Sequence, residues 1–66
     1  MMTEEEVKAL AAELYRTTPA DLILARAYAR GAQLVGLTRE EALSLIPTGN
    51  VGAALQILWM IEKVKP

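Results

Sequence analysis

The side chains that could do chemistry are few, and most of them are carboxylates. The chain has no histidine and no cysteine, so it lacks the commonest general base and the two usual transition-metal ligands. The candidate acids and bases are Glu4, Glu5, Glu6, Glu13, Glu40, Glu41 and Glu62. Acid–base catalysis needs a carboxylate desolvated in a cleft, and these lie at helix starts or on polar faces. We therefore predict a non-enzymatic chain with no catalytic, cofactor-binding or metal site.

Residues 32–38, Ala-Gln-Leu-Val-Gly-Leu-Thr, precede a predicted short helix over 39–46. The small Ala32 lets two helices cross closely, Gly36 makes the turn, and Thr38 caps the second helix. This corner resembles the core of a helix-turn-helix unit over about 20 residues. The resemblance implies a DNA-binding dimer, with Arg26, Arg30, Arg39 and Ser44 as the candidate nucleic-acid contacts.

The charges weigh against DNA as the partner. The second helix of this corner begins Arg39-Glu40-Glu41, so two carboxylates would face phosphates. Only Arg39 and Ser44 could donate from it to bases or backbone. The whole chain has a net charge of −1 rather than a basic excess. A structural corner, with Arg26 and Arg30 on a solvated face, is the simpler interpretation.

Gly49-Asn50-Val51-Gly52 has the spacing of a phosphate-binding or backbone-clamping loop. The loop has no basic residue beside it, no preceding strand and no Walker lysine. We predict instead that Gly52 marks a close approach between helices.

Four helices are expected, at about 3–16, 19–35, 39–46 and 51–64, in a single all-α domain of residues 1–66. Two of them begin with a capping box, in which a threonine and a glutamate three residues later satisfy each other's backbone N–H groups. Thr3 pairs in this way with Glu6, and Thr38 with Glu41.

The other two helix starts are predicted from single residues. Thr18 followed by Pro19 suits an N-cap and first helical position. Either Asn50 or Thr48 caps the last helix. Gly36 fits the position after the second helix, where φ is often positive.

The last helix carries an unusual excess of apolar residues. Between residues 51 and 61 only Gln56 is neither apolar nor glycine, and the second helix is apolar on two sides. A surface helix needs an apolar face only a little over ~100° wide. A chain this short buries only ~60% of the surface exposed when unfolded, so apolar surface should be left over. Burying ~400 Å² of it would contribute about 10 kcal/mol before association costs.

This excess favours self-association, with a twofold dimer as the commonest closed form. The predicted interface residues are Val51, Leu55, Leu58, Trp59 and Ile61, with Trp59 as the anchor because tryptophan is enriched at hot spots. Two alternatives stay open. The last helix could be the central core helix of a monomer, or its apolar face could meet a different partner, such as a larger protein or lipid.

The composition sets the broad class. A 53% hydrophobic content favours a folded chain. The acidic start, MMTEEEVK, differs from the basic start of a signal peptide, and the apolar run at 51–61 is too short to span a bilayer. We expect a cytoplasmic, homo-oligomeric interaction or regulatory module assembled through its last helix. The alternative is a small dimeric helix-turn-helix DNA-binding transcriptional regulator.

Overall fold

The fold is all-α, as predicted. In a computed structural model that describes residues 1–18 and 20–64, four α-helices and one short 3₁₀ turn follow one another, and this part of the chain contains no strand. The elements are α1 (Glu4–Thr17), α2 (Leu22–Leu34), α3 (Arg39–Ser44), η1 (Pro47–Gly49) and α4 (Val51–Val64). None of these helices combines the length and apolar character that a membrane crossing requires.

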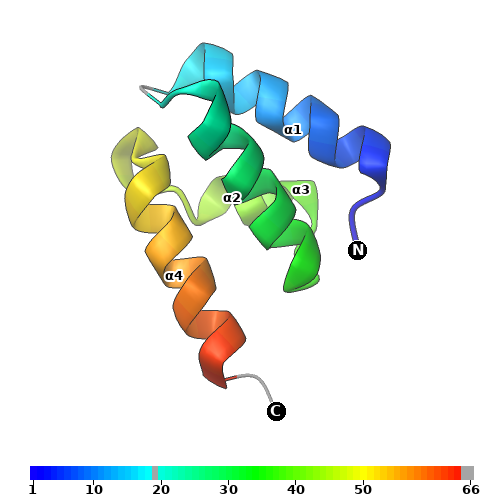
Figure 1. Cartoon of the computed structure of the whole chain (residues 1–66), viewed down its shortest axis with the longest axis vertical. Coiled ribbons are helices and arrows are strands. Elements are labelled where there is room, and N and C mark those ends of the chain that lie inside the picture. Colours follow the sequence, from blue (N-terminus) through cyan, green and yellow to red (C-terminus); the bar gives the residue numbers. More distant parts are fainter. Residues whose placement is uncertain (19, 65–66) are drawn as a thin grey trace.

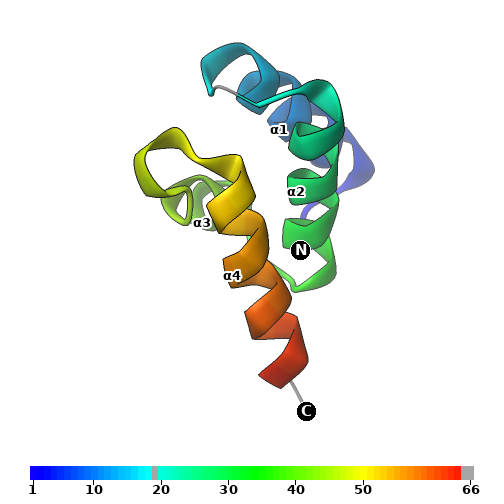
Figure 2. The ribbon, with the colours of Figure 1, turned by 60° about the vertical axis from the view of Figure 1, so that its left-hand side comes forward.

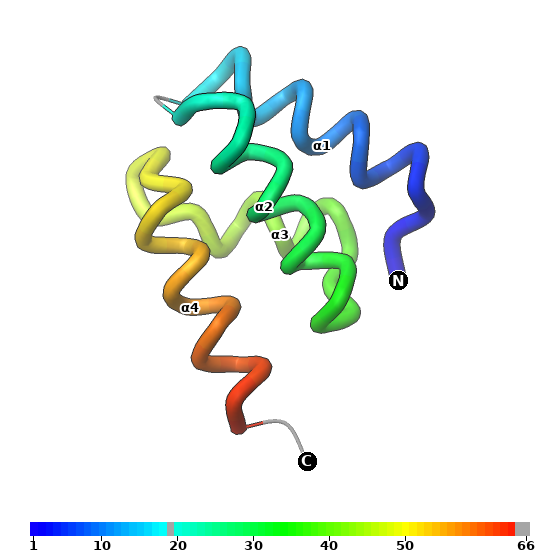
Figure 3. The backbone as a smooth tube through the Cα atoms, viewed as in Figure 1, coloured from blue at the N-terminus to red at the C-terminus, as the bar shows by residue number. Residues whose placement is uncertain are grey.

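The central helix is α2, not α4. It packs against α1 on one side and α4 on the other, while α3 lies behind it in the same view (Figure 1). In the turned view α1 overlaps α2 in the upper part of the molecule, and α4 runs downward to the C-terminus (Figure 2). The backbone tube shows that the last turns of α4 run past the end of α2 (Figure 3). The C-terminal part of α4 therefore has little of its own chain to pack against.

The core is built from small residues on α2 and larger ones on its neighbours. Ala25, Ala29 and Ala32 of α2 have no exposed surface, and neither has Tyr28. The larger core side chains include Leu10 and Leu14 of α1, and Val51 and Leu58 of α4. Because alanine side chains are short, the neighbouring helices can approach α2 closely. A larger side chain at one of these buried alanines should therefore lower the stability of the fold.

Both predicted capping boxes are confirmed. The Glu6 backbone N–H donates to Thr3 Oγ1 at 3.2 Å, and the Thr3 N–H donates to Glu6 Oε1 at 2.9 Å. The reciprocal bonds between Thr38 and Glu41 are 2.8 and 3.2 Å long. At α4 the Ala53 N–H donates to Asn50 Oδ1 at 3.1 Å, so Asn50 rather than Thr48 is the cap.

The start of α2 differs from the prediction. The helix begins at Leu22, with Asp21 as the N-cap accepting from the Leu24 N–H at 2.7 Å. Thr18 instead ends α1, where its N–H and its hydroxyl both donate to the Leu14 carbonyl oxygen, at 3.0 and 2.5 Å. The Asp21 carboxylate is also favoured by the helix dipole, so it caps better than a threonine hydroxyl. The predicted first helical residue, Pro19, lies outside the described residues.

The corner between α2 and α3 forms around Gly36, as predicted. Gly36 has a φ of +83°, and its N–H donates to the Gln33 carbonyl at 3.0 Å. The Leu37 N–H donates to the Ala32 carbonyl at 2.9 Å, which completes a Schellman motif. α3 ends at Ser44, two residues before the predicted Ile46, because Pro47 opens the separate turn η1.

The turn η1 contains a strained residue, which leads to a stability prediction. Thr48 has φ 49° and ψ 35°, a left-handed conformation that a β-branched residue adopts at a cost. Thr48→Asn should raise the free energy of unfolding by about 1 kcal/mol in urea titrations, because asparagine tolerates this conformation. Thr48→Ala is the control, since alanine keeps the penalty. An equal gain in both variants would rule out backbone strain as the cause.

Candidate interaction site

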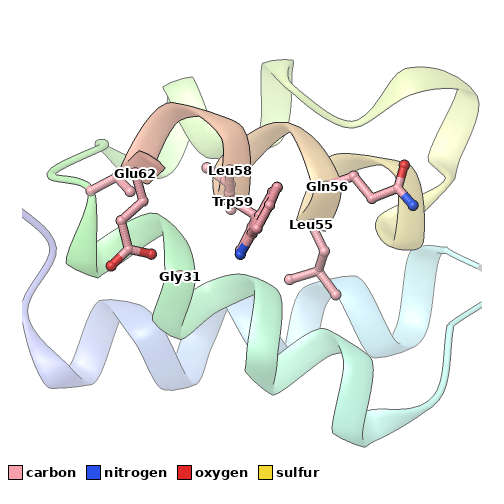
Figure 4. A pocket seen from close by; sticks show the side chains of 7 residues that line it. Gly31, Leu55, Gln56, Leu58, Trp59 and Glu62 are labelled. Carbon is pink, nitrogen blue, oxygen red and sulfur yellow. The ribbon is translucent and has the colours of Figure 1, made fainter. Parts of the chain in front are cut away.

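An apolar groove lies along the contact between α2 and α4. It has a volume of about 380 Å³ and is called here the α2–α4 groove. It is lined by Gly31, Val35, Leu55, Gln56, Leu58, Trp59 and Glu62. Figure 4 shows the Trp59 ring and the Leu55 side chain both extending from α4 toward α2, with Glu62 and Gln56 at opposite ends. The groove can therefore accept an apolar surface between two polar ends.

Helical spacing explains how the groove is formed. Leu55, Trp59 and Glu62 are spaced i, i+4, i+7, which places them on one face of α4. On α2 the position facing Leu58 is Gly31, where an added Cβ would lie 3.4 Å from Leu58 Cδ1. A Cβ at Gly31 would therefore make ordinary van der Waals contact with Leu58, and the space beside these two residues stays open.

The five predicted interface residues fall into two groups. Val51 and Leu58 belong to the chain's own core, with only 2% and 3% of their surface exposed. Leu55 and Ile61 are half-buried, whereas Trp59 is 60% exposed. α4 packs through the buried Val51, Ala54 and Leu58, at i, i+3, i+7. In this fold only Leu55, Trp59 and Ile61 of the predicted set have surface left for a partner.

Further apolar residues, outside the predicted interface set and outside the groove lining, are also exposed. On α4 these are Met60 and Val64, at 61% and 82% exposure, and on α2 they are Ile23 and Leu34, at 77% and 64%. Ile23 and Leu34 are eleven residues apart, about three turns, so they share one side of α2. The sequence shows that α2 is apolar on two sides. This pattern does not indicate which of the two sides the other helices cover and which stays exposed.

The indole ring of Trp59 also contacts a cation. Lys63 Nζ lies 5.2 Å from the ring centroid, within the range of a cation–π interaction. Lys63 lies one helical turn beyond Trp59 on α4, and its contact restrains the indole ring while leaving it exposed.

The candidate nucleic-acid residues are mostly engaged within the chain. Arg30 forms an ion pair with Glu4 at 2.6 Å and also donates to Gln33 at 2.5 Å. The Arg30 guanidinium is the main cause of a lowered pKa at Glu4. Arg26 is exposed. Arg30, one of the two predicted phosphate contacts on α2, therefore links α2 to α1 through its ion pair with Glu4.

The α3 candidates are held in a similar way. Arg39 forms an ion pair with Glu13 of α1, and the Ser44 hydroxyl donates to the Glu41 carbonyl at 2.8 Å. Hydrogen bonds from Thr38 lower the pKa of Glu41, so that carboxylate is committed to the helix start. A six-residue helix with these internal contacts offers few free donors to a DNA groove.

The predicted acid–base candidates are dispersed. Glu6 and Glu41 cap helices, while Glu4 and Glu13 form ion pairs with arginines. In residues 1–18 and 20–64, no three histidine, cysteine, aspartate or glutamate side chains gather where they could hold a metal ion.

Comparison of the chain with protein-family models, with curated proteins and with solved structures gives no match.

Proposed function

We propose that this chain is a non-enzymatic interaction or regulatory module that forms a homodimer through the α2–α4 groove and the exposed end of α4. The observation that carries the proposal is Trp59, a large apolar side chain that is 60% exposed at the edge of an apolar groove. Tryptophan anchors supply much of the binding free energy where they enter a partner's pocket. The groove provides such a pocket on each copy.

The surface of the chain is large enough for an interface with a second copy. A stable interface buries about 800 Å² on each partner. The chain exposes 4340 Å² in total, so such an interface would cover about a fifth of it. The groove, with the exposed Trp59 at its edge, lies on one helix pair and presents the same apolar surface from each copy. In a twofold arrangement, the Trp59 of one copy enters the groove of the other.

The test is the mass in solution, measured by light scattering over a range of protein concentrations. The unmutated chain should have the mass of a dimer, and Trp59→Ser should weaken the dimer by about thirtyfold or more, because it removes a hot-spot side chain. Tyr15→Ser is the matched control: Tyr15 is 54% exposed on α1, away from the groove, and its loss should leave the mass unchanged.

Two results would contradict the dimer. One is a folded monomer at every concentration, which would favour a different protein as the partner. The other is an equal loss of mass in the Trp59 and Tyr15 variants.

The DNA-binding alternative has less support. Arg30 and Arg39 would have to leave their glutamate partners before they could contact phosphates. A mobility shift with duplex DNA at low salt tests it, since binding through phosphates must weaken steeply as salt rises.

A further inference from the structure

A second groove lies between α1 and α2, and it is called here the basic groove. It has a volume of about 740 Å³. Its apolar lining residues are Val7, Ala11, Ala12, Leu22 and Ala27. Its polar lining residues are all cations: Lys8, Arg26 and Arg30. The lining thus combines an apolar surface with positive charge, whereas the α2–α4 groove has Glu62 and Gln56 as its polar residues.

The charge of this groove is unusual for the chain. The molecule has seven lysines and arginines and a net charge of −1, yet three of those cations line one groove, and the only acidic side chain paired with them in the described residues is Glu4, which contacts Arg30. Lys8 and Arg26 are both exposed. A negatively charged partner would therefore be attracted to this groove in preference to the rest of the acidic surface.

One carboxylate of the chain already occupies part of the site. Glu4 pairs with Arg30, at 2.6 Å between Oε2 and one terminal nitrogen and 3.1 Å between Oε1 and the other. Both side chains are largely exposed, at 62% and 50%, and exposed ion pairs contribute little to stability. An incoming carboxylate can replace Glu4 on Arg30, because it restores the same two hydrogen bonds, and the further bond that Glu4 accepts from Gln33 Nε2 at 3.2 Å is exposed.

The spacing of the arginines indicates the shape of the partner. Arg26 and Arg30 are four residues apart, or about 6 Å along the helix axis. Two acidic residues at i, i+4 on another helix have the same separation, so they can face both arginines at once. Ala11, Ala12 and Ala27 are short, which lets the backbone of such a helix approach closely.

We propose that the basic groove binds an acidic amphipathic helix of a partner protein, with two carboxylates on Arg26 and Arg30 and leucine-type side chains on the alanine-lined surface. This site is separate from the dimer contact proposed above and uses different side chains of α2. It gives the module a second partner, of acidic character.

The probe is a labelled synthetic helix of about 14 residues with leucines at i, i+3, i+7 and glutamates at two i, i+4 positions along their edge. Binding is measured by fluorescence anisotropy at low salt. Arg26→Gln should weaken binding by about tenfold, and replacing both glutamates of the probe with glutamine should do the same. Arg16→Gln removes the same charge from α1 outside the groove and should leave the affinity within about twofold.

A gain of affinity gives an independent check. Glu4→Gln removes the competing negative charge from Arg30, so it should tighten binding of the acidic probe by roughly fivefold. Circular dichroism confirms that each variant remains helical. Equal losses in the Arg26 and Arg16 variants would overturn the proposal, and so would equal binding of the glutamate and glutamine probes. Binding to anionic phosphatidylglycerol vesicles but not to the probe would overturn it in favour of a membrane surface. None of these results depends on whether Trp59→Ser changes the mass.

Discussion

Replacing Ala32 with leucine should unfold the domain or lower its free energy of unfolding by about 3 kcal/mol or more. Ala32 has no exposed surface, and its carbonyl accepts the Leu37 N–H at the corner that joins α2 to α3. Three added carbons have no space to enter, so either α2 moves or a neighbouring helix does. A domain of this size has a total stability of about 5 kcal/mol, so the loss should be visible as reduced helicity at room temperature.

Ala27→Leu is the matched control for this prediction. Ala27 lies on the same helix, five residues earlier, but it is exposed. The leucine should therefore change the stability by no more than about 0.5 kcal/mol. Urea unfolding followed by circular dichroism compares the two variants. If both variants unfold at the same urea concentration, the buried alanines of α2 are not closely packed against the neighbouring helices.

Features determined by neighbouring residues were predictable from the sequence. The capping boxes at Thr3 and Thr38 and the turn at Gly36 each depend on groups within a few positions. The start of α2 was not, because two capping residues, Thr18 and Asp21, stand three positions apart. In the structure the Thr18 N–H and hydroxyl both donate to the Leu14 carbonyl at the end of α1, so Asp21 is left to cap α2.

The rotation of α4 could not be predicted, and this affected the candidate site. A helix that is apolar nearly all round has no broad polar face to show which side is outside. Its orientation is set by close contact with α2, where Leu58 lies against Gly31. Trp59 is the next residue, 100° further around the helix, so it stays exposed while Leu58 is buried. A sequence pattern cannot separate two such neighbours when both are apolar.

Long-range ion pairs were also beyond the sequence analysis. Arg30 and Glu4 are 26 residues apart, as are Arg39 and Glu13. No local spacing signals these pairs, since they exist only after α2 and α3 have packed against α1. They change the interpretation of Arg30, which helical periodicity placed with Arg26 on a solvated face and which pairs with Glu4 in the structure.

The second large effect is expected at alkaline pH. Tyr28 is fully buried on α2, its hydroxyl donates to the Ala42 carbonyl of α3, and burial raises its pKa from 10.0 to about 12. The folded state therefore holds this proton more tightly than the unfolded state. The resulting stabilisation is fully present below pH 10 and is lost as the pH rises toward 12. The rise in pKa corresponds to roughly 3 kcal/mol, a large part of the stability of a small domain.

Urea unfolding from about pH 9 upward measures this loss. The experiment uses a Tyr15→Phe background, so that Tyr28 is the only phenol whose ionisation the tyrosinate absorbance reports. The free energy of unfolding should fall steeply above pH 10, and ionisation of Tyr28 should coincide with loss of helicity. Adding Tyr28→Phe lowers stability at neutral pH by about 1 kcal/mol, since the hydrogen bond to Ala42 is lost, but it should remove the alkaline fall. A fall of equal size with and without the Tyr28 hydroxyl would mean that other groups cause the alkaline unfolding and that the α2–α3 contact has no part in it.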